Sequence, residues 1–129
     1  MAIKLWSTLA VDDLARSRAF YAALGFEVRD VPGGAGITVH PDGSSILCIF
    51  ERDAFDSMLP NEICDTTRCN ETITSVAADT RDDVDRMVSL ARNAGARVIG
   101  APKAAPWGYG HGFADPDGHI WSVIWLGAR

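Results

Sequence analysis

Histidines are the residues in this sequence best suited to metal or proton chemistry near neutral pH. There are three, His40, His111 and His119, and an imidazole can bind a divalent ion or exchange a proton. His40 and His119 adjoin predicted turns, whereas His111 lies in a separate predicted strand, which disfavours one shared ion. His111 could instead exchange protons in a site, but a structural or solvent-facing role is the favoured interpretation.

Cysteine chemistry is limited by the number and spacing of the thiols. Cys48, Cys64 and Cys69 form an odd set without a CxxC pair, which argues against both a disulfide framework and a zinc knuckle. We therefore expect buried free thiols. Cys64 could be a reactive thiol, although no base stands beside it in the sequence.

Glycines alternate with large residues near the end of the chain. Gly108, Gly110 and Gly112 leave one face of a predicted strand bare. Such a strip predicts the close approach of a ligand or of another backbone, or a strained edge without a role.

Composition restricts the classes of protein to which the chain can belong. The 129 residues are 47% hydrophobic and 22% charged, the profile of a single globular domain over residues 1–129. The formal net charge is -5 with scattered acidic residues, so we expect no nucleic-acid partner. No signal peptide or membrane span is recognisable, which predicts a cytoplasmic protein without a membrane partner.

The elements expected to position these residues follow one order twice. In residues 1–51 we predict a strand over 3–11, a helix after Asp12 or Asp13 that ends at Gly25, and strands over 26–31, 36–40 and 45–50. Residues 52–70 form a connecting segment with a short helix near 54–58. In residues 71–129 we predict a strand over 72–78, a helix capped by Thr80 that ends at Gly95, and strands over 96–100, 109–114 and 119–126, with a loop over 102–106.

This internal repeat predicts an α+β fold. Two tandem βαβββ repeats would form a curved mixed sheet around a cleft, with the helices on the outer face. Clefts of this kind favour small-molecule ligands.

The chain carries four recognisable motifs, VDDLARS at residues 11–17, FY at 20–21, LGF at 24–26 and FADPDGH at 113–119. Together they resemble the vicinal oxygen chelate superfamily, which includes glyoxalase I, bleomycin and fosfomycin resistance proteins and extradiol dioxygenases. The resemblance covers nearly the whole chain. A closer likeness, to bacterial predicted lactoylglutathione lyases, is carried by EICDTT at 62–67 and GHIW at 118–121.

The resemblance implies where a metal would be held, and the residues at those positions are poor ligands. Counting from the motifs places the family's first ligand at Trp6, the second at about Thr72 with one residue of slippage, and the third at Ser122, where the family has a glutamate. A fourth position falls at Cys48. Hard divalent ions need several nitrogen or oxygen donors, so we expect no metal and no other cofactor.

A cleft with these residues would present hydroxyls on an apolar background. Strand alternation places Thr8 beside Trp6, Thr74 after Thr72, and Ile120 and Ile124 beside Ser122. The predicted ligand-binding residues are accordingly Trp6, Thr8, Cys48, Thr72, Thr74 and Ser122. Trp6 either stacks on a ligand or fills the vacated metal site as core, while Trp121 and Trp125 should pack beneath the helices.

Three functions remain open at this point. The first is a metal-free protein that binds a small organic molecule in its cleft. The second is a lactoylglutathione-lyase-like or other enzyme that uses an unrecognised metal, or a metal-free mechanism with Cys48, Cys64 or His111. The third is a subunit whose main contribution is an interface, and a homodimer is expected.

Overall fold

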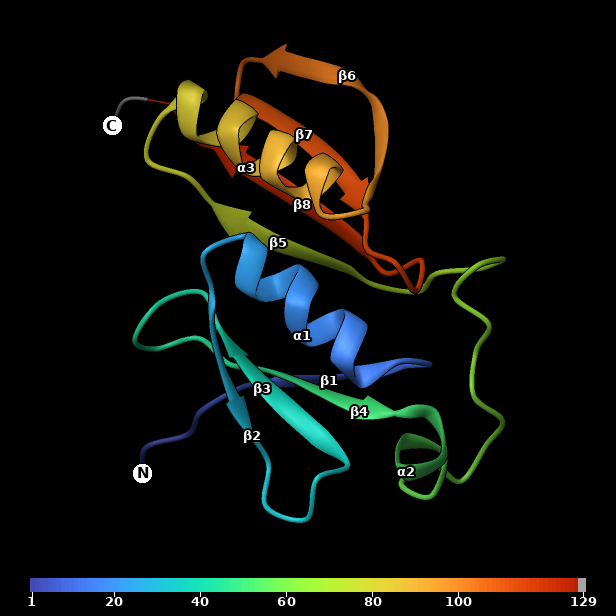
Figure 1. Ribbon diagram of the computed structural model, residues 1–129. Helices are drawn as coiled ribbons and strands as arrows, with labels where there is room; N and C mark the ends of the chain where they lie inside the picture. Colours follow the sequence, from blue (N-terminus) through green and yellow to red (C-terminus); the bar gives the residue numbers. More distant parts are fainter. Residues whose placement is uncertain (128–129) are drawn as a thin grey trace. The chain divides into compact units, whose positions relative to one another are not determined.

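The computed structural model describes residues 1–127, and Figure 1 shows their helices and strands. In chain order these are β1 (Ser7–Val11), α1 (Leu14–Ala23), β2 (Glu27–Asp30), β3 (Gly36–His40), β4 (Leu47–Glu51), α2 (Arg52–Asp56), β5 (Ile73–Ala77), α3 (Arg81–Asn93), β6 (Arg97–Ala105), β7 (Gly108–Ala114) and β8 (Ile120–Trp125). The two predicted βαβββ repeats are confirmed. The fold is α+β.

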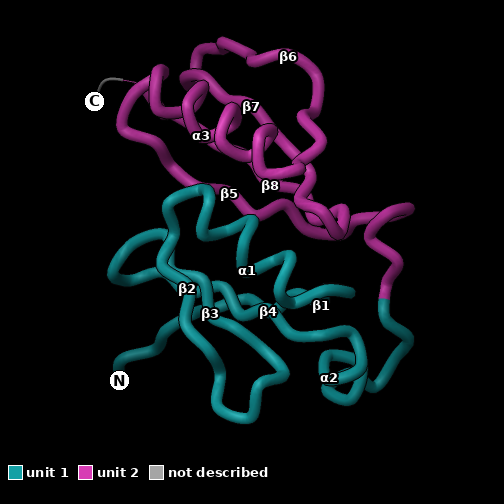
Figure 2. The backbone as a smooth tube through the Cα atoms, in the orientation of Figure 1, with its two compact units in different colours: residues 1–63 teal, residues 64–129 magenta. Residues whose placement is uncertain are grey.

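The chain divides into two compact units, residues 1–63 and residues 64–129 (Figure 2). Each unit holds one four-stranded mixed sheet, with the order β1-β4-β3-β2 in the first and β5-β8-β7-β6 in the second. In both, the first strand of the repeat pairs in parallel with the last, and the remaining pairs are antiparallel. Corresponding strands therefore have the same neighbours in both units.

Helix boundaries follow the local signals in the sequence. The Asp13 side chain accepts from the backbone N–H of Arg16 at 3.0 Å, and the Thr80 hydroxyl accepts from that of Asp83 at 3.0 Å, so both predicted N-caps are confirmed. Gly25 and Gly95 follow α1 and α3 with φ of 88° and 109°, as left-handed C-terminal residues do.

Each of the two long helices, α1 and α3, covers one face of its own sheet. In unit 1, the fully buried strand residues are Val11, Ile37, Val39 and Ile49, which share a face with the buried α1 residues Phe20 and Tyr21. In unit 2, Trp121 and Phe113 are buried and their rings stack with centroids 6.1 Å apart, which confirms that Trp121 belongs to the core.

Helix α3 is also tied to β7 through polar contacts. The Tyr109 hydroxyl donates to the Asp85 carboxylate at 2.6 Å, and the Arg81 guanidinium lies 4.2 Å from the centre of the Tyr109 ring. The hydrogen bond to Asp85 raises the pKa of Tyr109, because ionisation would place two negative charges side by side.

Several predicted bounds of the elements were wrong. Strand β1 begins at Ser7, so residues 3–6 of the predicted strand lie outside any strand. Strand β6 continues to Ala105, where a loop over 102–106 was predicted, and its register with β7 shifts between Ile99 and Lys103. The irregularity absorbs Pro102, which cannot donate to a ladder, and His111 Nε2 lies 2.9 Å from the carbonyl oxygen of Gly100 there. Helix α2 begins at Arg52, two residues before the predicted start. None of the helices described in residues 1–127 combines the length and the apolar character that a membrane span requires.

Candidate functional site

The face of the unit 1 sheet opposite α1 carries a row of polar side chains. The backbone register sets Thr8 of β1 beside Cys48 of β4, and Cys48 beside Thr38 of β3. Residues in register point to the same side of a sheet, so two hydroxyls flank one thiol. All three are half-buried, which leaves them able to contact a ligand.

The central thiol of this row stays protonated near neutral pH. Burial raises the pKa of Cys48 above its ordinary value, and a hydrogen bond with the Thr8 side chain opposes that effect only in part. A protonated thiol is a weak nucleophile. Cys48 therefore suits packing and weak hydrogen bonding better than covalent chemistry.

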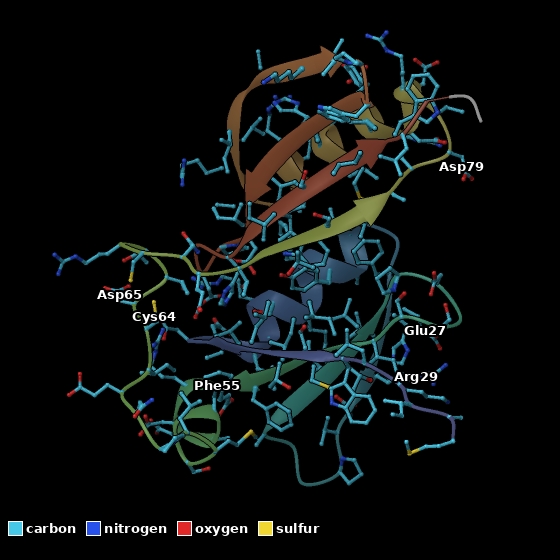
Figure 3. All side chains as sticks on the ribbon, turned by 180° about the vertical axis from the view of Figure 1, so that it is seen from behind. Glu27, Arg29, Phe55, Cys64, Asp65 and Asp79 are labelled. Atoms are coloured by element: carbon cyan, nitrogen blue, oxygen red, sulfur yellow. The ribbon has the colours of Figure 1, made fainter. Side chains whose placement is uncertain are left out.

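A pair of oppositely charged side chains borders the row. On β2, Glu27 is in register with His40 and Arg29 with Thr38, and Figure 3 labels the Glu27 and Arg29 side chains. Arg29 donates twice to the Glu27 carboxylate, with both N···O distances at 3.0 Å. That pairing lowers the pKa of Glu27 and raises the pKa of Arg29, so the two charges neutralise each other at the border of the row.

An aromatic ring covers part of the same face, and an exposed tryptophan directly precedes the strand that carries Thr8. Trp6 directly precedes β1 and is 57% exposed, so the alternative in which it fills the core is wrong. The Phe50 ring lies over Gly36, where an added Cβ would stand 2.7 Å from two of its carbons. His40 Nε2 lies 2.8 Å from the Thr38 hydroxyl, so this histidine belongs to the polar row.

The corresponding face of unit 2 is poorer in polar groups. Ser122 of β8 is in register with Ser75 of β5 and with Gly112 of β7. Ile73, Ile120 and Ile124 share that face. The Trp107 ring reaches over Gly110, where an added Cβ would lie 3.1 Å from it. The bare glycine strip is therefore occupied by this ring and by the close β8 backbone.

The register corrects one part of the predicted lining. Thr74 pairs with the buried Trp121, not with Ser122, so it lies on the helix-covered side, and Thr72 directly precedes β5. Ser75 takes the place expected for Thr74. The error is one residue, the slippage that the sequence count left open, and one residue reverses the face of a strand.

Comparison with known proteins agrees with this architecture. Residues 5–123 match the Glyoxalase/Bleomycin resistance protein/Dioxygenase superfamily. The chain belongs to this superfamily. It is also 34% identical over 127 residues to the uncharacterized protein MT0910 of Mycobacterium tuberculosis, an alignment that covers 89% of this chain and 69% of that protein.

Several solved structures are similar to this chain in fold. The hypothetical protein SA1046 of S. aureus is 29% identical with a TM-score of 0.85, covering 96% of this chain and 94% of its own. TnmS3, an antibiotic binding protein from Streptomyces sp. CB03234, is 26% identical with a TM-score of 0.66, covering 98% and 99%. A glyoxalase-related enzyme from Fulvimarina pelagi is 20% identical with a TM-score of 0.81, covering 95% and 87%, and supports the fold alone.

The superfamily's metal does not fit the side chains at the positions implied for its ligands. Indole, thiol and hydroxyl groups of Trp6, Cys48 and Ser122 stand there, and these are poor partners for a hard divalent ion. No group of three His, Cys, Asp or Glu side chains within residues 1–127 could hold an ion. His40 lies within hydrogen-bond distance of the Thr38 hydroxyl, and His111 of the Gly100 carbonyl oxygen. His119 is buried. The three imidazoles therefore lie in three different surroundings.

Sequence reasoning missed four polar residues of the two uncovered sheet faces and misjudged two thiols. To find Thr38, Ser75, Glu27 and Arg29 requires the strand register, which the sequence does not specify. Strand parity on residues 36–40 could have suggested Thr38 only if the partner strand had been known. Cys64 and Cys69 are exposed, so the expectation that the thiols are buried was wrong for both.

Proposed function

We propose that the protein binds a small, uncharged or weakly polar aromatic molecule on the face of the unit 1 sheet that carries Thr8, Cys48 and Thr38. The carrying observation is that row of hydroxyl, thiol and hydroxyl groups, with the exposed Trp6 directly before the strand that carries Thr8. An indole offers a flat stacking surface, and the hydroxyls supply direction. The similarity to an antibiotic binding protein supports binding without chemistry.

Ser122 contributes a second, weaker surface in this proposal, together with Ser75. We infer a metal-free site from the residue types at the implied ligand positions, since Trp6, Cys48 and Ser122 offer no set of hard donors. The neutralised Glu27–Arg29 pair also favours an uncharged ligand over an ion.

Titration with 1-naphthol tests the proposal, with cyclohexanol as the matched compound that keeps the hydroxyl and lacks the aromatic ring. We expect 1-naphthol to bind once per chain and to quench tryptophan fluorescence, and expect the Trp6→Leu variant to lose most of that quenching. Cyclohexanol should bind more weakly because it cannot stack. Absence of calorimetric binding by 1-naphthol at about 1 mM would count against the proposal.

The likeness to predicted lactoylglutathione lyases leads to a separate expectation. Isomerisation of a hemithioacetal needs an ion on the substrate oxygens and a carboxylate base near the migrating proton. Ser122 supplies neither. With nickel, zinc, manganese or iron added, we expect no thioester above background from methylglyoxal and glutathione, and well below one equivalent of metal retained after desalting. Metal-stimulated turnover that Ser122→Ala abolishes would show the assignment to be wrong.

A homodimer is part of the same proposal. Ile73, Leu5 and Trp107 are large apolar side chains that remain 65%, 92% and 45% exposed in the single chain, and such surfaces favour association between copies. Light scattering at micromolar concentration should give twice the mass of the chain, and a monomer would contradict this part.

A further inference from the structure

Two exposed thiols lie in contact in the segment that leads into β5. The Sγ atoms of Cys64 and Cys69 are 3.0 Å apart, and both residues are exposed. Cys64 is labelled in Figure 3 beside Asp65. The site proposed above does not use either thiol.

A tight turn between the two cysteines brings them together. The backbone N–H groups of Arg68 and Cys69 both donate to the carbonyl oxygen of Asp65, at 3.0 and 3.1 Å. The Asp65 carboxylate accepts from the backbone N–H of Thr67 at 3.0 Å and from its hydroxyl at 2.7 Å. The turn is thus held by its own hydrogen bonds, so the thiols meet without requiring a ligand.

The segment is also anchored to the turn between β7 and β8. The Thr66 hydroxyl donates to the carbonyl oxygen of Asp117 at 2.6 Å, and Asn70 Nδ2 donates to that of Gly118 at 3.0 Å. Gly118 has a φ of 87°, and an added Cβ would lie 2.4 Å from the Thr66 carbonyl oxygen. Contacts between the two cysteines and directly after Cys69 therefore hold the backbone in the geometry that joins the thiols.

We propose that Cys64 and Cys69 are a redox modification site, which forms a reversible intramolecular disulfide by exchange with a low-molecular-weight disulfide such as glutathione disulfide. One cysteine loses its proton and attacks a glutathione sulfur, so a mixed disulfide forms and one glutathione thiolate leaves. The second cysteine then loses its proton and attacks the protein sulfur, and the other glutathione leaves. Two cysteine thiols are oxidised, and one glutathione disulfide is reduced to two thiolates, which take up the two protons that the cysteines released.

The pKa of Cys64 determines how the rate of this exchange depends on pH. The hydrogen bond with Cys69, partial desolvation, and the nearby carboxylates of Asp65 and Glu71 raise the pKa of Cys64. Attack requires the thiolate, so exchange begun by Cys64 is slow near neutral pH and accelerates as the pH rises. The second step is intramolecular between sulfurs already in contact, so it should outpace the first.

Intact-mass analysis after incubation with glutathione disulfide tests the proposal, in a Cys48→Ser background that leaves only this pair. The parent should lose two hydrogen atoms and retain no glutathione, and dithiothreitol should reverse the change. The matched Cys69→Ser and Cys64→Ser variants lack the second thiol, so each should retain one glutathione.

Peptide mapping must assign the new bond to residues 64 and 69. Retention of one or two glutathiones on the parent would overturn the proposal, as would two free thiols in the parent under conditions that modify either single-cysteine variant. Full resistance of all three proteins would overturn it too. Because no ligand enters this experiment, its outcome is independent of the binding proposal.

Discussion

The two sheets share one topology and differ on the face that their helices leave uncovered. The row across β1, β4, β3 and β2 reads Thr8, Cys48, Thr38 and Arg29. The corresponding row across β5, β8, β7 and β6 reads Ser75, Ser122, Gly112 and Ile99. Equivalent backbone positions thus carry a polar row in one unit and a short, largely apolar row in the other. Repetition of a fold preserved the scaffold here while the surface chemistry diverged.

Aromatic rings cover glycines on both faces, yet they come from different places. In unit 1 the ring of Phe50, in the neighbouring strand, lies over Gly36, while in unit 2 the ring of Trp107, in the turn before β7, lies over Gly110. Unit 2 thereby covers the strip beside Ser122 with its own side chain. The difference leaves more polar side chains on the uncovered face of unit 1 than on that of unit 2.

Gly108→Ala should be the most damaging of the substitutions that probe this comparison. Gly108 opens β7 with a φ of 144°, and an added Cβ would lie 1.9 Å from the carbonyl oxygen of Trp125. Backbone strain and a clash with another backbone add, so we expect a loss of about 4 kcal/mol or more in the free energy of unfolding. Urea denaturation measures it, and a loss below about 1 kcal/mol would show that β7 and β8 are not so closely joined.

Gly36→Ala is the matched substitution at the start of β3 in unit 1, and it should cost less. Its added Cβ would meet the Phe50 ring at 2.7 Å and the Ile49 carbonyl oxygen at 3.0 Å, without a positive φ. The ring can rotate away, so we expect a loss of about 1–2 kcal/mol by the same denaturation experiment. A loss equal to that of Gly108→Ala would mean that the Phe50 ring is fixed.

Most of the fold could be predicted from the sequence because its signals are local. The caps at Asp13 and Thr80 and the terminal glycines Gly25 and Gly95 specify both long helices without reference to distant residues. The β6 irregularity was missed because Pro102 was interpreted as a loop, while tertiary pairing with β7 restores the strand after it. The candidate site was less accessible, since the neighbours of Cys48 and Ser122 depend on pairing between strands far apart in the sequence.

Thr8→Val and Ser122→Ala compare the two faces in ligand binding. Both substitutions remove one hydroxyl, but only Thr8 belongs to the polar row of unit 1. A hydrogen bond contributes about 1 kcal/mol, so Thr8→Val should weaken 1-naphthol binding about fivefold and Ser122→Ala less than twofold. Calorimetry on both variants, with matched unfolding curves as the control, decides it. Equal weakening by the two substitutions would remove the distinction between the faces.

Cys48 gives the smallest effect, a dependence of stability on pH that unit 2 cannot show, because serine occupies the equivalent position 122. Burial raises the pKa of Cys48 above its ordinary value of 9.0, so the folded state holds the thiol proton more tightly than the unfolded state. This stabilising contribution is complete below the pKa of the unfolded state and is lost as the pH rises through the pKa of the folded state.

The double variant Cys64→Ser/Cys69→Ser, which keeps the Cys48 thiol, should therefore lose stability above about pH 8 relative to the triple variant in which Cys48→Ser is added. Both proteins retain Tyr109, whose raised pKa affects the two equally, so the difference between their denaturation midpoints isolates Cys48. Parallel curves from about pH 7 to pH 10 would mean that the thiol is as well solvated in the folded protein as in the unfolded chain, and the row that it joins would then be too open to orient a ligand.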